Sequence, residues 1–134
     1  MAERVLVMGR ITVQPGVINS WVTRAVAGDG FYYAPDPSSQ VVCSIGGNVA
    51  ENSGGLRGLK YGVTRDYVMG LEVVLPDGRI ARFGNACVKD VAGYSMKDLF
   101  IGVPVVLGRL PEEAESTIRR VAAASSTAVN SIVE

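Results

Sequence analysis

The sequence contains no histidine among its 134 residues, and this absence removes several kinds of site at once. Histidine is the side chain that most often serves as general base or metal ligand near neutral pH. A Ser-His-Asp catalytic site and a histidine-based metal site are therefore both excluded. We predict no catalytic residue and no metal ligand in this chain.

The sequence also has few cysteines and no formal net charge. The two cysteines, Cys43 and Cys87, lie among apolar neighbours; they could pair or stay free, and we expect buried, inert thiols. Thirteen basic residues balance thirteen acidic ones, so no basic field is available to attract nucleic acid or a membrane surface.

Long apolar runs are missing as well. No run reaches the roughly 20 residues that a membrane span needs, and the N-terminal MAERVLVMGR carries charges where a signal peptide needs an apolar stretch. A cytoplasmic, reducing location is the resulting expectation.

Apolar residues and glycines are what the chain does contain. Hydrophobic residues make up 48% of the sequence, and the length is sufficient for one domain, residues 1–134, with its own core. Sixteen glycines stand beside only three phenylalanines and one tryptophan. This composition predicts a turn-rich fold built from small side chains.

The most unusual stretch is Pro35–Gly62, which we call the glycine segment; its centre, residues 44–55, reads SIGGNVAENSGG. Glycine costs conformational entropy on folding, so its concentration here needs a reason. A glycine-rich turn is the simplest explanation. We favour close approach of backbone N–H groups to an anionic ligand, with little contribution to the core. Neither GxGxxG after a strand nor GxxxxGK[ST] is present, which excludes the Rossmann and P-loop motifs.

Before this segment the pattern predicts strands and then a helix. Residues 5–13 are β-branched and aliphatic around Gly9, which indicates two short strands at a tight turn or one bulged strand. A helix follows, with Asn19 or Ser20 as its N-cap and a left-handed cap at residues 28–30. Its predicted apolar face consists of Trp21, Val22, Ala25 and Val26.

After the glycine segment a β-hairpin is the clearest prediction. Residues 67–75 have strand composition, residues 76–78 read Pro-Asp-Gly, and residues 79–83 alternate polar and apolar as a half-solvated strand does. Residues 84–93 are irregular. We then expect a helical turn at 94–101 with inward side chains, a strand at 103–107, a helix at 111–124 and a final short helix or strand at 127–134; the inward side chains are Met96, Leu99 and Phe100.

These elements together predict an α+β fold with an antiparallel or mixed sheet flanked by helices. Two further motifs have an ordinary structural explanation. In Lys60-Tyr61-Gly62 the tyrosine is either a core aromatic or packs beside a ligand that Gly62 admits. By physics alone, Lys89-Asp90 in the stretch 89–94 is an ion pair and a turn.

Several motifs occur in one order: VQPGV, YYAPDPSS, CSIGGNVAENSGG, LKYG, GLEVVLPDG, and VKDVAGY with DLFIG. The series resembles the FAD-linked oxidoreductases related to the flavin subunit of glycolate oxidase and to D-lactate dehydrogenases. These belong to the group of vanillyl-alcohol oxidase and p-cresol methylhydroxylase (PCMH). The resemblance covers about residues 14–102 and leaves residues 103–134 as a divergent C-terminal strand and helix. It implies the second subdomain of a PCMH-type FAD-binding domain.

The resemblance also implies that FAD is the cofactor and indicates which residues hold it. In this family the PDPSS stretch helps to hold FAD, the SIGGNVAENSGG stretch lines the diphosphate and the flavin, and a tyrosine-glycine step lies close by. The predicted cofactor residues are accordingly Pro35, Asp36, Ser39, Ser44, Gly46, Gly47, Asn48, Ala50, Asn52, Gly54, Gly55, Tyr61 and Gly62.

The sequence also departs from the family. The first FAD-binding subdomain, the Ser-Glu-Gly-Thr-Leu-Gly type motif after Gly102 and the histidine-containing cap domain have no counterpart here, so the chain looks like a fragment or a shortened relative. We expect the FAD-binding portion of a flavin-dependent 2-hydroxy-acid oxidoreductase, not catalytically complete alone and binding FAD weakly or not at all by itself. The alternative is a non-enzymatic remnant that forms a homo-oligomer or binds a complementing chain. A nucleotide-phosphate site unrelated to flavin has only Arg57, Lys60 and Arg65 in its favour.

Overall fold

The computed structural model describes residues 3–5, 9–75, 77–85, 87–102 and 128–131. Five strands form one sheet in the order β1-β2-β5-β3-β4, with every neighbouring pair antiparallel. The strands are β1 Glu3–Val5, β2 Arg10–Val13, β3 Val68–Val74, β4 Ile80–Gly84 and β5 Ala128–Ser131. The helices are α1 Asn19–Val26, α2 Ile45–Glu51, α3 Gly58–Tyr61 and α4 Thr64–Tyr67, and the 3-10 turns are η2 Ala27–Asp29 and η3 Met96–Leu99.

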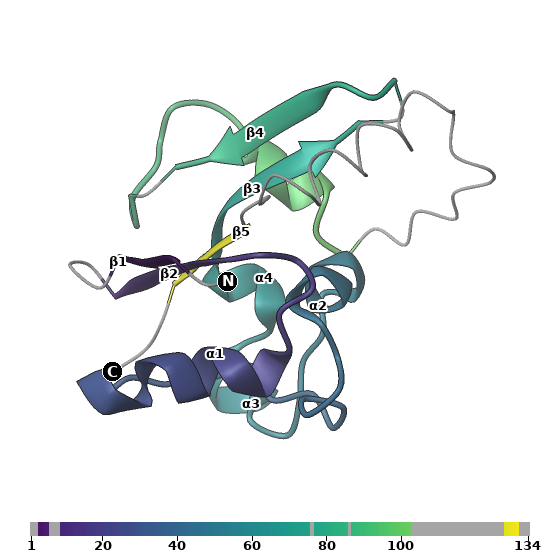
Figure 1. The fold of residues 1–134 in the computed structure, drawn as a ribbon. Helices are drawn as coiled ribbons and strands as arrows, with labels where there is room; N and C mark the ends of the chain where they lie inside the picture. The colour runs from purple at the N-terminus through teal and green to yellow at the C-terminus, as the bar shows by residue number, and fades with distance from the viewer. Residues whose placement is uncertain (1–2, 6–8, 76, 86, 103–127, 132–134) are drawn as a thin grey trace.

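Helices α1 to α4 gather below the strands, while η3 lies beside the β3–β4 hairpin (Figure 1). Sheet and helices thus form separate layers, as an α+β fold requires. The predicted α+β fold, with an antiparallel sheet and flanking helices, is confirmed. Within the described residues, no helix is long and apolar enough to cross a membrane.

Both predicted hairpins are present. In the first, Val5 pairs with Arg10, which confirms two strands and not one bulged strand. In the second, Leu71 of β3 pairs with Phe83 of β4, and alternate residues of β4 are exposed, as predicted for a half-solvated strand. The last element is also a strand, β5, which lies between β2 and β3. The strand predicted at 103–107 and the helix at 111–124 lie outside the described residues.

Helix α1 begins differently from the prediction. Its N-cap is Ile18, whose side chain makes no capping hydrogen bond, so the assignment of Asn19 or Ser20 as N-cap is wrong. The backbone N–H of Asn19 donates to the carbonyl of Cys43, and that of Ser20 donates to the carbonyl of Gln40, each at 3.0 Å. The free donors at the helix start are thus satisfied by a distant turn and need no local side chain.

The face and the end of α1 give one correction and one confirmation. Val22 and Val26 are fully buried, but Trp21 is 54% exposed and does not share their face, so its predicted place was wrong. Adjacent residues lie about 100° apart around a helix, which separates Trp21 from Val22. The chain then passes through η2 to Gly30, whose φ of +86° confirms the left-handed cap.

The core lies between the sheet and helices α1 and α2. It includes Ile11 and Val13 of β2, the apolar face of α1, and Leu71 of β3. Ile45 and Val49 of the glycine segment also belong to it, with Ile45 fully buried. The expectation that this segment contributes little to the core was therefore wrong.

Three other predictions about burial also need correction. Met96 and Leu99 are 45% and 61% exposed, and of the predicted inward residues only Phe100 packs, stacked on Phe83 at 4.7 Å between ring centroids. Cys43 and Cys87 are both free thiols, but neither is fully buried, because Cys43 is partly buried and Cys87 is exposed. The apolar residues Val88, Val91 and Tyr94 near Cys87 are themselves exposed, so they do not bury it.

Candidate functional site

The centre of the glycine segment folds into a helix, which the sequence did not predict because glycine disfavours helices. Ser44 is the N-cap of α2; its backbone is extended, and its Oγ accepts a hydrogen bond from the N–H of Gly47 at 3.2 Å. Gly46 and Gly47 therefore occupy the first turn of a helix and not a loop. The missed signal was the serine itself, a preferred N-cap residue followed three positions later by the amide it caps.

Helix α2 ends at Asn52, which has φ +50° and ψ +50°. It is the single non-glycine residue with positive φ in the described part of the chain. Asparagine tolerates the left-handed conformation better than most residues. Its side-chain Oδ1 accepts a hydrogen bond of 2.8 Å from the N–H of Arg65.

Several glycines of the segment are required by close contacts inside the chain. A methyl group on Gly46 would lie 2.7 Å from Cβ of Pro15, and one on Gly54 would lie 2.7 Å from Cγ1 of Val63. A methyl group on Gly55 would overlap the backbone carbonyl of Asp36. The segment thus packs tightly against the backbone of Asp36 and the side chains of Pro15 and Val63. The scarcity of Cβ atoms therefore has an internal reason in addition to any ligand.

The PDPSS stretch, residues 35–39, begins the glycine segment and packs against its later part. Pro35 is buried, and its carbonyl accepts a hydrogen bond from the side chain of Asn19 at 3.3 Å. The carboxylate of Asp36 accepts a hydrogen bond from the N–H of Arg57 at 3.2 Å and forms an ion pair with the guanidinium Nε at 3.3 Å. Ser39 lies in the following turn, where its carbonyl accepts hydrogen bonds from the N–H groups of Val42 and Cys43.

Tyr61 ends helix α3, is partly exposed and packs against the edge of the core. Its ring meets that of Tyr32 edge-on, with 6.1 Å between centroids, and the Nζ of Lys60 lies 4.8 Å from its centroid. A hydrogen bond with Tyr32, and then the nearby Lys60, lower the pKa of the Tyr61 phenol. The adjacent Gly62 has φ +82°, and a methyl group there would meet the carboxylate of Asp66.

Asn48 lies in the middle of α2 with only 2% of its surface exposed. Its Nδ2 is buried and has no hydrogen-bond partner among the described residues. Buried amide groups in native proteins nearly always have a partner, because leaving one unpaired costs about 1–3 kcal/mol. Within the described residues, Asn48 therefore has a free N–H donor, which could form a hydrogen bond with an acceptor atom of a bound ligand.

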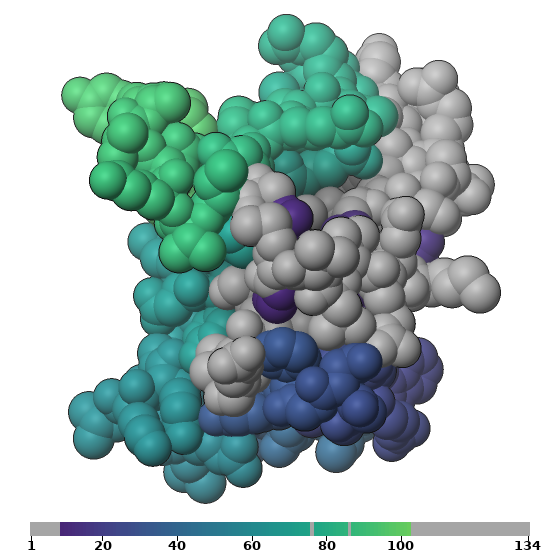
Figure 2. Space-filling model, turned by 90° about the vertical axis from the view of Figure 1, so that its left-hand side faces the viewer, coloured from purple at the N-terminus to yellow at the C-terminus, as the bar shows by residue number. Residues whose placement is uncertain are grey.

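A separate cleft of about 630 Å³ opens next to α4. In Figure 2 the green residues of the loop before Gly102 stand beside the β3–β4 hairpin, with a hollow between them. Its lining includes Arg65 and Asp66 but none of the predicted cofactor residues. The sequence does not predict this cleft. Its walls come from the β3–β4 hairpin with α4 and from residues 87–98, and no sequence motif indicates that these segments lie close together.

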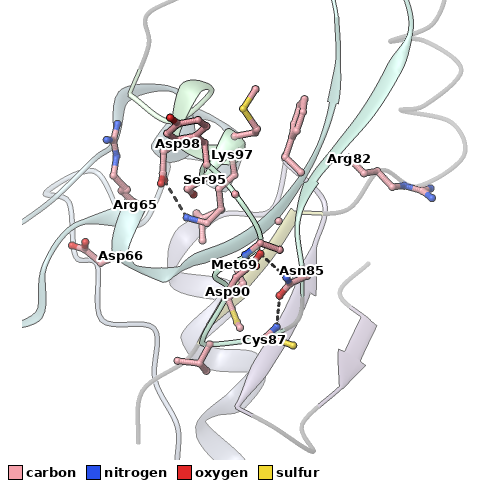
Figure 3. A pocket seen from close by; sticks show the side chains of 18 residues that line it. Arg65, Asp66, Met69, Arg82, Asn85, Cys87, Asp90, Ser95, Lys97 and Asp98 are labelled. Carbon is pink, nitrogen blue, oxygen red and sulfur yellow. Dashed lines mark hydrogen bonds and ion pairs between the residues drawn. The ribbon is translucent and has the colours of Figure 1, made fainter.

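Loop residues line much of the cleft, and Figure 3 shows Asn85 between Asp90 and Cys87 while Arg82 points away from them. Asp90 accepts hydrogen bonds from Nδ2 of Asn85 at 2.6 Å and from the N–H of Ala92 at 3.1 Å. The predicted turn is therefore present, and these contacts, not an ion pair with Lys89, are the ones found for the carboxylate.

The comparison with protein families identifies the class of this domain. The model of the FAD binding domain family matches residues 4–84, and the chain belongs to this family. The resemblance drawn from the motifs is confirmed, and FAD is the cofactor of the class.

Within this family, the chain is similar to subunits of glycolate oxidase and to a D-lactate dehydrogenase. The glycolate oxidase subunit GlcD of Bacillus subtilis (strain 168) is 60% identical over 101 residues, which cover 75% of this chain and 22% of that protein. GlcD of Escherichia coli (strain K12) is 48% identical over 99 residues, 74% of this chain and 20% of that protein. A D-lactate dehydrogenase of Anaerostipes hadrus is 41% identical over 102 residues, 76% of this chain and 21% of that protein. The chain spans about a fifth of the length of these relatives.

A solved structure shows the same fold. An alkyldihydroxyacetonephosphate synthase superposes with a TM-score of 0.67 over 96% of this chain and 21% of its own chain, at 21% sequence identity. At this identity the likeness establishes the architecture and not the activity.

Proposed function

We propose that this chain is the FAD-binding portion of a flavin-dependent 2-hydroxy-acid oxidoreductase of the glycolate oxidase and D-lactate dehydrogenase type. The observation that carries the proposal is the 60% identity to a glycolate oxidase subunit over 101 residues. These relatives favour it over a non-enzymatic, partner-binding remnant. We take residues 1–134 as one FAD-binding unit, cytoplasmic as the composition suggests.

The glycine segment is the proposed place of FAD. The buried Nδ2 of Asn48 fits this role because it is a donor without a partner in the described part of the chain. The proposed cofactor residues are those that the family motifs indicate: Pro35, Asp36, Ser39, Ser44, Gly46, Gly47, Asn48, Ala50, Asn52, Gly54, Gly55, Tyr61 and Gly62.

The chain's own residues would bind and orient the cofactor. When bound, FAD supplies the hydride acceptor for the carbon that bears the hydroxyl group of a 2-hydroxy acid. Asn48 would donate a hydrogen bond to the cofactor, and Asp36 with Arg57 would hold the two edges of the segment together. Tyr61, with its lowered pKa, would lie beside the cofactor. No residue is assigned to proton abstraction, so the chain is proposed to be catalytically incomplete alone.

Titration of the purified apo-protein with FAD tests the proposal, followed by flavin fluorescence and visible absorption. Of the two outcomes expected from the sequence, weak binding or none, we propose weak but saturable binding by the chain alone. Asn48→Ala should weaken it further, about tenfold, as loss of one buried hydrogen bond predicts. Asn85→Ala, outside the glycine segment, is the matched control and should leave the dissociation constant unchanged. A wild-type chain that shows no saturable binding would contradict the proposed function.

Turnover is a separate measurement. With FAD, an artificial electron acceptor and glycolate or D-lactate, we expect no oxidation by the chain alone. Stoichiometric flavin together with steady oxidation of either acid would show that the chain is catalytically complete and would refute that part of the proposal.

A further inference from the structure

The first turn of α4 is bonded to the end of α2. The Thr64 side chain is fully buried, and its Oγ1 donates to the carbonyl of Ser53 at 2.7 Å, while its N–H donates to the same oxygen at 3.0 Å. The next N–H, from Arg65, donates to Oδ1 of Asn52. These bonds fix the chain direction directly after the left-handed Asn52.

Arg65 makes a second connection through its side chain. Its guanidinium Nη2 donates a hydrogen bond to the carbonyl of Ile101, and the N–H of Gly102 donates to the carbonyl of Val49 at 3.0 Å. Residues 101 and 102 are therefore tied to both α4 and α2. Arg65 joins these segments, which are distant in the sequence.

The fit around this connection is close. Gly102 has φ +74°, and a methyl group there would lie 2.8 Å from Cβ of Asn52 and 3.4 Å from Nη2 of Arg65. Ile101 is fully buried beneath it. Arg65 also lines the 630 Å³ cleft, so the same residue borders the cleft and contacts the glycine segment.

We propose that Arg65 is a positioning residue of the flavin site, which fixes residues 101–102 against the end of α2 and so sets the geometry of the segment around Asn52. The inference rests on the proposed function. Its consequence is that FAD binding at the glycine segment stabilises residues 96–102, to which no cofactor contact is assigned. The guanidinium is needed because the bond to the Ile101 carbonyl is charge-assisted and geometrically specific.

Arg65→Gln is the direct test. It retains the backbone N–H that binds Asn52 and removes only the charged donor to Ile101. Arg79→Gln is the matched control, because Arg79 is also an exposed arginine, 78% accessible, and pairs with Asp77 in the β3–β4 turn. Arg65→Lys retains one charged donor and serves as the conservative variant. Far-UV circular dichroism checks that each variant is folded.

Two measurements are needed, the dissociation constant of FAD and amide hydrogen exchange of residues 96–102 with and without FAD. In the wild type and in Arg79→Gln we expect FAD to slow this exchange. In Arg65→Gln we expect about tenfold weaker binding, as for loss of one charge-assisted hydrogen bond, and no slowing at saturating FAD. Arg65→Lys should recover part of both effects.

The outcomes separate this inference from the proposed function. If the wild type binds FAD and Arg65→Gln binds it equally well with the same slowing of exchange, the positioning role of Arg65 is wrong while the flavin site stands. An equal loss of affinity in Arg79→Gln would also overturn it. A wild type that fails to bind FAD overturns the proposed function first.

Discussion

The backbone carbonyl of Asp36 lies directly against Cα of Gly55, so close that a methyl group on the glycine would overlap it. The carboxylate of the same aspartate binds the N–H and the guanidinium of Arg57. The beginning and the later part of the glycine segment, which the sequence separates, are thereby held together.

Substitution of Gly55 by alanine should therefore be strongly destabilising. The added methyl group meets backbone and not a side chain that can move aside, so we expect a loss of about 3 kcal/mol in the free energy of unfolding, or no folding. Chemical denaturation measures it. Gly16→Ala is the control, because a methyl group there has no neighbour within 4 Å. Equal stability of the two variants would show that the Asp36–Gly55 contact is wrong.

Loss of the Ser44 hydroxyl should weaken helix α2. Ser44→Ala removes the acceptor for the N–H of Gly47 and should cost about 1 kcal/mol. Ser44→Thr retains an oxygen at the same place and should recover most of this loss. Denaturant unfolding compares the three proteins, and an alanine variant as stable as the wild type would mean that the cap does not contribute.

Burial of Tyr33 predicts a loss of stability at high pH. Burial raises the pKa of Tyr33 from 10.0 to about 12. A phenol that resists ionisation in the folded state contributes stability that is fully present below pH 10.0 and is lost as the pH rises toward 12. Comparison of the unfolding free energy of the wild type and Tyr33→Phe across this range measures the effect. The phenylalanine variant should show a shallower decline; identical slopes would contradict the prediction.

The two thiols should differ in reactivity. Cys87 is exposed and Cys43 is partly buried, so an aromatic disulfide reagent at neutral pH should react with Cys87 first. Cys87→Ser should remove the fast phase and leave the slow one, while Cys43→Ser should do the opposite. Two equally slow phases in the wild type would indicate that the irregular stretch shields Cys87.

The local signals of the sequence determined some elements by themselves. The β3–β4 hairpin follows from strand composition before a Pro-Asp-Gly turn and period-two alternation after it, and the cap at Gly30 follows from glycine at a helix end. The order of motifs also indicated the FAD-binding family, because it depends only on residue identities along the chain. The turn and cap signals each lie within a few neighbouring residues, and the motif order requires only the identities of the residues along the chain.

The tertiary structure decided the rest. Gly46 is needed because Pro15 packs on it, the start of α1 is satisfied by the Gln40–Cys43 turn, and β5 pairs between β2 and β3. These contacts join residues far apart in the chain, so no local pattern in a single sequence predicts them. For the same reason Ile45 and Val49 become core residues within a glycine-rich stretch, and Trp21 remains exposed on a helix whose Val22 and Val26 are buried.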